Sequence, residues 1–221
     1  VRPKGEDVEV LGTVPIRGDI AANGITVLPW RARAADFGAA TFQTQVWLVA
    51  RADSPLRPVT PTGSLAADIA LSKKLLPGRL LQGKANTCLD PDLYDLKSTG
   101  AQIKLFSGSL NEIAPALING EAELTLLDVP DALVALQKWP GKIKILGPLT
   151  GTQDMAPAFR KDAKRLREAF NEFLAQCRRD GTLERLAQKY YPIVFDYYPE
   201  FFRSRPVAAA GPAAHRARSA P

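Results

Sequence analysis

Two short stretches of the sequence carry side chains that could bind the two ends of a small zwitterion. The stretch "ANGITVLPWR" contains Gly24 and Thr26 and ends in Arg31. Accessible backbone N–H groups, a hydroxyl and a guanidinium are donors that suit a carboxylate, and Arg can bind one through two parallel hydrogen bonds. The run "AELTLLD" ends in Asp128, whose carboxylate suits an amine. Together these residues predict a site for a molecule that carries both charges.

A third polar stretch, "KANTC" at positions 84–88, places an amide and a hydroxyl in a loop that follows a predicted strand. Asn86 and Thr87 stand just before a predicted helix start, where backbone N–H groups favour an anion. Thr87 is therefore a further candidate for contact with a carboxylate. Trp30 is consistent with either a hydrophobic core or a surface lid, and the sequence does not decide between them.

Each candidate also has a simpler structural interpretation. Arg31 could pair on the surface with Asp36 or Glu123, and such pairs are common and weak. Asp128 could do no more than cap the helix that follows it, which is a frequent role for Asp. Thr87 could be an ordinary turn hydroxyl. Taken singly, motifs of this length recur by chance, so both interpretations stay open for every residue.

The elements around these residues predict an α/β fold. Apolar runs at 45–50, 79–82, 102–106, 122–128 and 142–147 are typical of strands, and patterns at 64–78, 109–120, 129–139, 162–181 and 182–191 are typical of helices. Pro115 requires the second of these helices to begin after Ser109. Because strands and helices alternate between Gly63 and Gly147, we expect βαβ crossovers and mostly parallel sheets flanked by helices. Ligands of such sheets bind beyond the carboxyl ends of the strands.

The composition favours a folded body with a basic tail over a nucleic-acid-binding protein. The 221 residues include 29 basic and 23 acidic side chains, a net charge of +6. The stretch 203–221 has no acid, and without its four arginines the rest balances to 25 against 23, or +2. We therefore expect a disordered tail at 201–221 and no nucleic-acid partner. The apolar runs are too short to span a bilayer, and the first residues show no signal-peptide pattern.

Cysteine and histidine usage argues against metal, cofactor and histidine chemistry. Cys88 and Cys177 have no metal-site spacing, and a disulfide between them stays open as an alternative to two free thiols. Cys177 follows the apolar stripe of the helix at 162–181 and is predicted to be buried. His215, in the tail, is the one histidine. We expect no metal and no cofactor.

Three ordered runs resemble the family 3 extracellular solute-binding proteins. The runs begin with "GDIAANGITVLPWR", "GAQIKLFSGSLNEI" and "APAFRKDAKRLREAF", and the resemblance covers roughly 15–193. It implies the two-lobed, type II periplasmic binding-protein fold and a monomeric receptor, not an enzyme, that binds an amino acid and delivers it to the permease of an ABC importer. It also implies a periplasmic location.

The same resemblance assigns the site residues. The family pattern G-x-T-x-x-x-x-R, which binds the ligand carboxylate, falls on Gly24, Thr26 and Arg31. The K-x-x-T loop falls on 84–87 and implies that Thr87 adds a hydroxyl, while the strand-end Asp that binds the ligand ammonium corresponds to Asp128. Two departures stand out: Cys88 replaces the usual Gly after the Thr, and a Trp replaces the usual acid before the Arg.

The resemblance also divides the chain. We expect lobe one at 1–49 plus 158–200 and lobe two at 50–157, joined by hinges near 48–51 and 156–159. Relatives begin with a strand, a helix and a strand before "GDIAA", and only about fifteen residues stand there in this sequence, so lobe one is expected to be incomplete.

Two other functions remain as alternatives. One is a dehydratase of small acids on the same fold, with Asp154 or Glu123 as general acid, although no nucleophile–base pair is visible. The other is a sensor or accessory module of a larger cell-envelope system, such as a cell-wall lytic enzyme. The low-complexity tail argues against the latter.

Overall fold

The computed structural model describes residues 2–4, 7–9 and 18–197. The chain divides into two compact units, Val1–Asn171 and Glu172–Pro221. Helix α5 (Lys164–Arg179) begins in the first unit and ends in the second. The basic tail expected at 201–221 lies outside the described residues.

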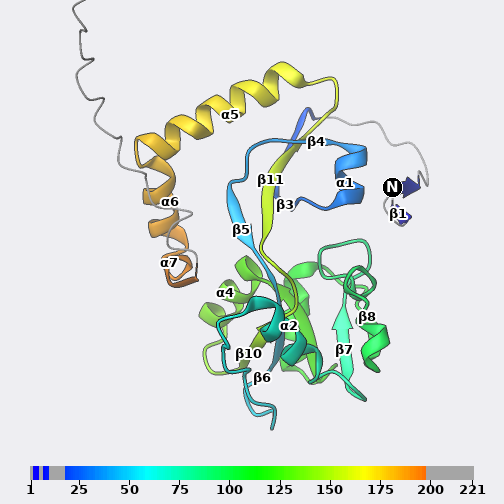
Figure 1. The fold of residues 1–221 in the computed structure, drawn as a ribbon. Helices are drawn as coiled ribbons and strands as arrows, with labels where there is room; N and C mark the ends of the chain where they lie inside the picture. The colour runs from blue at the N-terminus through cyan, green and yellow to red at the C-terminus, as the bar shows by residue number, and fades with distance from the viewer. Residues whose placement is uncertain (1, 5–6, 10–17, 198–221) are drawn as a thin grey trace, which may run out of the picture. The chain divides into compact units, whose positions relative to one another are not determined.

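One sheet of the first unit is built around strand β11 (Gln153–Phe159). β11 pairs antiparallel with β3 (Ile20–Thr26), β4 (Asp36–Phe37) and β5 (Phe42–Thr44). Figure 1 shows β11 as the long yellow-green strand beside β3 and β5. The last residue of β3, Thr26, pairs with Met155 and is 2% exposed, so this end of the strand is held in the interior. A separate two-stranded sheet joins β1 (Arg2–Lys4) to β2 (Asp7–Glu9).

The second sheet of this unit has five strands in the order β10-β6-β9-β7-β8. They are β6 (Val46–Arg51), β7 (Leu80–Gly83), β8 (Gln102–Leu105), β9 (Leu124–Asp128) and β10 (Ile143–Pro148). β7 is parallel to both β8 and β9, as expected from the crossovers between them. β6 is antiparallel to both β9 and β10.

The α/β class and the sheets flanked by helices are confirmed, but the expectation of mostly parallel sheets is wrong in detail. β6 enters its sheet directly from β5, so it starts beside the point where β9 ends, with Val46 opposite Asp128. β10 must run back towards the same edge because it leads into β11. The two strands that connect the sheets therefore run opposite to their neighbours.

The neighbouring strands β6 and β9 are buried on both faces. Every residue of β9 is buried, as are the first five residues of β6. Such continuous apolar runs are typical of strands covered by other elements on either side. Leu48, Leu124 and Leu126 are fully inaccessible. Because β9 is packed in this way, its last residue, Asp128, is held in a fixed place.

Three of the four α-helices described in this unit fall within the ranges predicted for helices, and α1 (Pro29–Ala34) is the exception. The others are α2 (Leu65–Lys73), α3 (Ile113–Ile118) and α4 (Val129–Lys138), with short 3₁₀ segments η1 (Pro91–Tyr94), η2 (Lys97–Thr99) and η3 (Leu110–Glu112). Ser109 and Glu112 form a capping box before α3. α3 begins only at Ile113, so Pro115 falls in the first turn, where no backbone donor is needed.

The chain passes between the two sheets of this unit at two points, Gln45 and 149–152. Both are tied by hydroxyl groups: the Val129 N–H donates to Thr44 Oγ1 at 3.1 Å, and the Val46 N–H donates to Thr150 Oγ1 at 2.9 Å. The hinge positions expected at 48–51 and 156–159 lie inside β6 and β11, where ladder hydrogen bonds oppose bending. The crossing points are instead at the strand ends.

The second unit continues α5 and adds α6 (Thr182–Tyr190) and α7 (Val194–Tyr197). The helices predicted at 162–181 and 182–191 are therefore confirmed. Gly181 separates them with a positive φ of 75°, a backbone geometry that favours glycine. Cys177 is buried, as expected. Among the described residues, every helix is too short or too polar to serve as a membrane span.

Candidate functional site

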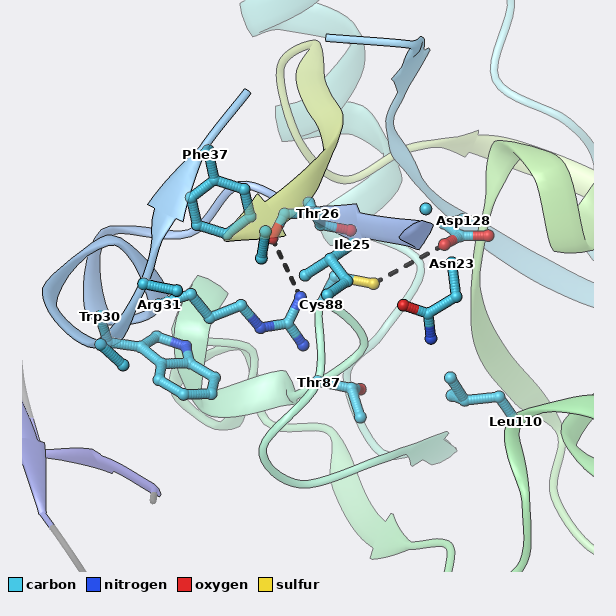
Figure 2. Close-up of a pocket in the computed structure, with 14 residues that line it drawn as sticks. Asn23, Ile25, Thr26, Trp30, Arg31, Phe37, Thr87, Cys88, Leu110 and Asp128 are labelled. Carbon is cyan, nitrogen blue, oxygen red and sulfur yellow. Dashed lines mark hydrogen bonds between the residues drawn. The ribbon is translucent and has the colours of Figure 1, made fainter. Parts of the chain in front are cut away.

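A cavity of about 360 Å³ lies within the first unit. Its walls come from the β3–α1 segment and β11 on one side and from the loops after β7 and β9 on the other. All of the site residues predicted from the sequence line it: Gly24, Thr26, Arg31, Thr87 and Asp128. Figure 2 shows Arg31 and Asp128 at opposite ends, with Cys88 between them.

Arg31 reaches the cavity because β3 and α1 are joined by a tight connection. Pro29 occupies the first turn of α1, where its missing N–H costs nothing, and the helix carries Arg31 back towards Thr26. Arg31 Nη1 donates to Thr26 O at 3.0 Å, and the guanidinium carbon lies 5.2 Å from the centre of the Trp30 ring. Burial lowers the pKa of Arg31, while Cys88 opposes that shift. An anion bound in the cavity would stabilise the charged form of Arg31 and raise its pKa again.

The surface-pair interpretation of Arg31 has no support in the geometry. Asp36 forms its ion pair with Arg167 at 3.0 Å, and Glu123 forms its pair with Arg79 at 3.0 Å. Each acid is thus matched by another arginine. One of the five N–H groups of Arg31 binds Thr26 O, and the side chain lines the cavity.

Asp128 is both a helix cap and a wall of the cavity. Its Oδ1 accepts a hydrogen bond from the Asp131 N–H at 3.1 Å, which caps α4 as the simpler interpretation holds. Its Oδ2 accepts from the Cys88 thiol at 3.7 Å. The residue is only 6% exposed. Burial, helped by the negative charge of Asp131, raises the pKa of Asp128 to about 7.

The loop after β7 holds Thr87 in a turn. The Thr87 hydroxyl donates to Lys84 O at 2.8 Å and accepts from the Leu89 N–H at 3.0 Å, so the turn interpretation is correct for this side chain. Thr87 nevertheless lines the cavity. Asn86, the other candidate in this loop, adopts a positive φ of 62° and does not belong to the cavity lining.

Cys88 is a cavity residue that the sequence reasoning missed. The sequence distinguishes it only as a possible disulfide partner and as a departure from a family pattern, although its place next to Thr87 is a usable signal. Both cysteines are free thiols. Burial raises the pKa of Cys88 to about 12, and Asp128 adds to the shift. The neutral thiol is therefore the form that faces the carboxylate, and the Tyr94 hydroxyl donates to Cys88 O at 2.6 Å.

Trp30, which the sequence leaves open as core or lid, is a cavity residue, and several of its neighbours were missed. Trp30 is 8% exposed and lines the cavity, so it is a buried wall and no surface lid. Its indole Nε1 has no hydrogen-bond partner among the described residues. Asn23, Phe37 and Leu110 also line the cavity, and no motif in the sequence distinguished them.

The carboxylates named for a dehydratase lie elsewhere. Glu123 is bound to Arg79 and to the Leu80 N–H at 3.2 Å, at the start of β9. Asp154 is in β11, and its backbone oxygen accepts from Val27. Neither side chain is part of the cavity lining. Among the described residues, no group of His, Cys, Asp and Glu side chains is arranged to hold a metal ion.

Two sheets joined by two crossing segments, with a cavity lined from both, define a binding-protein fold. The chain belongs to the bacterial extracellular solute-binding proteins, family 3, whose sequence profile matches residues 16–193.

Solved structures share this fold. A variant of ArgBP from T. maritima is 22% identical with a TM-score of 0.65, and the match covers 79% of this chain and 69% of that one. The substrate-binding protein of an amino acid ABC transporter is 18% identical with a TM-score of 0.63, and covers 80% of this chain and 72% of that one. At such identities these matches show the fold.

One curated relative belongs to a different functional class. The chain is 26% identical over 186 residues to the membrane-bound lytic murein transglycosylase F of Desulfosudis oleivorans. The match covers 81% of this chain but only 38% of the relative, so the chain spans well under half of that protein's length.

Proposed function

We propose that this protein is a receptor that binds an amino acid in the cavity. The observation that carries the proposal is the placement of Arg31 and Asp128 in one cavity, each brought there by a different sheet. Arg31 binds the ligand carboxylate, supported by Gly24, Thr26 and Thr87. Asp128 binds the ligand ammonium.

The electrostatics of the site support this assignment. Burial raises the pKa of Asp128 and lowers that of Arg31, so the charged form of each group is destabilised by the loss of water. A zwitterion supplies the opposite charge to each of them. Buried charges that are paired and hydrogen-bonded are tolerated where isolated ones are not. An α-amino acid carries these two charges on one carbon, and it is small enough for a cavity at the lower end of the usual range.

Ligand capture proceeds by closure of two lobes. The lobes follow the division expected from the sequence, 1–49 plus 158–200 and 50–157, with the boundaries moved to the crossing points at Gln45 and 149–152, where bending takes place. A ligand held by Arg31 recruits Asp128 from the other side. The closed form is then stabilised by contacts that the open form lacks.

Delivery to the permease of an ABC importer completes the proposed role. Family membership and the fold shared with the substrate-binding protein of an amino acid ABC transporter support it. The protein acts in the periplasm, as a monomer, without a cofactor and without catalysis.

The test is the binding of amino acids to the parent and to Arg31→Ala, measured by titration calorimetry after native mass spectrometry for a co-purified ligand. Truncating one partner of a buried charge pair costs about 2–5 kcal/mol, so affinity should fall at least about 30-fold. Arg33→Ala is the matched control, because Arg33 lies on the same helix, is exposed and does not line the cavity. Equal binding by Arg31→Ala and the parent would refute the assignment.

A second candidate is a ligand-sensing module of a cell-wall lytic enzyme. The match to the transglycosylase over most of this chain favours it. In that case the protein would bind a peptide or amino acid of the cell wall, and it would associate with murein rather than with a permease. Co-sedimentation with purified murein sacculi, with and without the ligand, separates the two roles.

A further inference from the structure

We propose that the ligand is an amino acid whose side chain is uncharged and largely apolar. The inference rests on the proposed function, since it assumes that Arg31 and Asp128 bind the carboxylate and the ammonium. Of the described residues that line the cavity, these two alone have a charged side chain. Once the ligand's own two charges are matched, nothing in this lining is left to pair with a third.

The remaining walls are mostly apolar. Ile25, Trp30, Phe37 and Leu110 contribute hydrocarbon and aromatic surface, and small alanines fill the space between them. In Figure 2, Trp30 and Phe37 lie towards the Arg31 end and Leu110 lies below Asn23. Such surface favours a ligand with an apolar side chain, because the free energy gained on burial is proportional to the apolar area removed from water.

A cationic side chain would need a second carboxylate. The acid nearest in sequence to Asp128 is Asp131, but Asp131 lines a separate cavity of about 160 Å³, and Leu110 lines both cavities. The Asp131 side chain also interacts with Asp128, and burial raises its pKa. A cationic side chain of the ligand would therefore lose its water in the main cavity without gaining a carboxylate, which is unfavourable.

An anionic side chain would need a second cation. Lys84 is the closest along the chain to the loop that carries Thr87, and its Nζ donates to the backbone oxygens of Phe106 and Gly108. It does not belong to the cavity lining. Arg31 is already assigned to the carboxylate, so a second anion would also be unpaired.

The test compares L-leucine, L-lysine and L-glutamate by titration calorimetry on the full chain at pH 8. Leucine is apolar, whereas lysine adds a positive and glutamate a negative charge, so the comparison reports how the cavity accepts each kind of side chain. We expect leucine to bind at least 100-fold more tightly than lysine or glutamate. If lysine or glutamate binds as tightly as leucine, the inference is overturned and the proposed function stands. If none of the twenty common amino acids binds, the proposed function itself is refuted.

A charge placed in the wall gives an independent test. Leu110 is 37% exposed at the start of η3, so a polar side chain is tolerated there. Leu110→Glu should lower the leucine affinity and raise the lysine affinity, with a change in the ratio of at least 10-fold. Leu110→Gln, of the same shape without the charge, should weaken leucine binding without favouring lysine. An unchanged ratio in a folded Leu110→Glu protein would contradict the inference.

Discussion

Replacing Asp128 by Asn removes a buried negative charge and keeps the cap of α4. The Asn side-chain oxygen can still accept from the Asp131 N–H, since Asn and Asp are comparable at the first position before a helix. The substitution is also nearly equal in volume. Its main effect is therefore electrostatic, and it acts on stability and on ligand binding in opposite directions.

The magnitude follows from the shifted pKa. Burial first, and Asp131 second, raise the pKa of Asp128 from 3.8 to about 7. Each pKa unit corresponds to about 1.4 kcal/mol, so ionisation of Asp128 lowers the stability of the folded protein by up to about 4 kcal/mol. Because the native pKa lies above the unfolded one, the native state binds more protons between these values. Stability of the parent should thus fall as pH rises from about 4 to about 7, and the full cost persists above that range.

The assay is urea unfolding of the parent and Asp128→Asn at pH 4 and at pH 8. The variant should gain up to about 4 kcal/mol at pH 8 and little at pH 4, while calorimetry should show that it has lost amino-acid binding. Asp131→Asn is the control, since it should keep the ability to bind. Lower stability of Asp128→Asn at pH 8, or an equal gain at both pH values, would refute the charge-burial reasoning.

Two further predictions concern the thiols and the core. In a Cys177→Ser background, Cys88 of the folded protein should react slowly with Ellman's reagent at pH 8, because burial raises the pKa of this thiol to about 12. The same thiol should react rapidly once the protein is unfolded in urea. Rapid stoichiometric labelling of the folded protein would contradict this prediction. Phe159→Ala should lower the free energy of unfolding by about 3–5 kcal/mol, because the ring is 1% exposed and packs at 5.7 Å against Phe170. Denaturant titration measures the second effect, and a loss below about 1 kcal/mol would show that the site collapses around the cavity.

Local patterns in the sequence were sufficient for much of the fold. The apolar run that became β9, the Ser109–Glu112 capping box and the stripe of α5 each depend on residues close together in the chain. The sequence also named five residues that line the cavity, because each lies at a strand end or in the short segment that follows one, while their part in ligand binding stays a prediction. Such features are encoded locally, so no tertiary information was needed.

The directions of β6 and β10 could not be predicted in the same way. They depend on where the chain passes between the two sheets, which is set by pairing with β9 and β11 far away in the sequence. The elements before residue 45 were missed for another reason. Four residues at the start of β3 are exposed and lack an apolar alternation, and α1 has only six residues. The role of Trp30 was equally hidden, since burial and a place in a cavity wall leave no distinct pattern.

The Val129 N–H donates to Gln45 O at 3.2 Å as well as to Thr44 Oγ1. The residue that follows Asp128, the proposed ammonium-binding carboxylate, is therefore tied to the connection at which we propose that the lobes bend. In the proposed receptor, a ligand that draws Asp128 closer would act on that connection through this amide and through the β6–β9 ladder, in which Asp128 is paired with Val46. Selection can consequently tune ligand affinity by altering the backbone around Thr44 and Gln45, at a distance from any atom that the ligand touches.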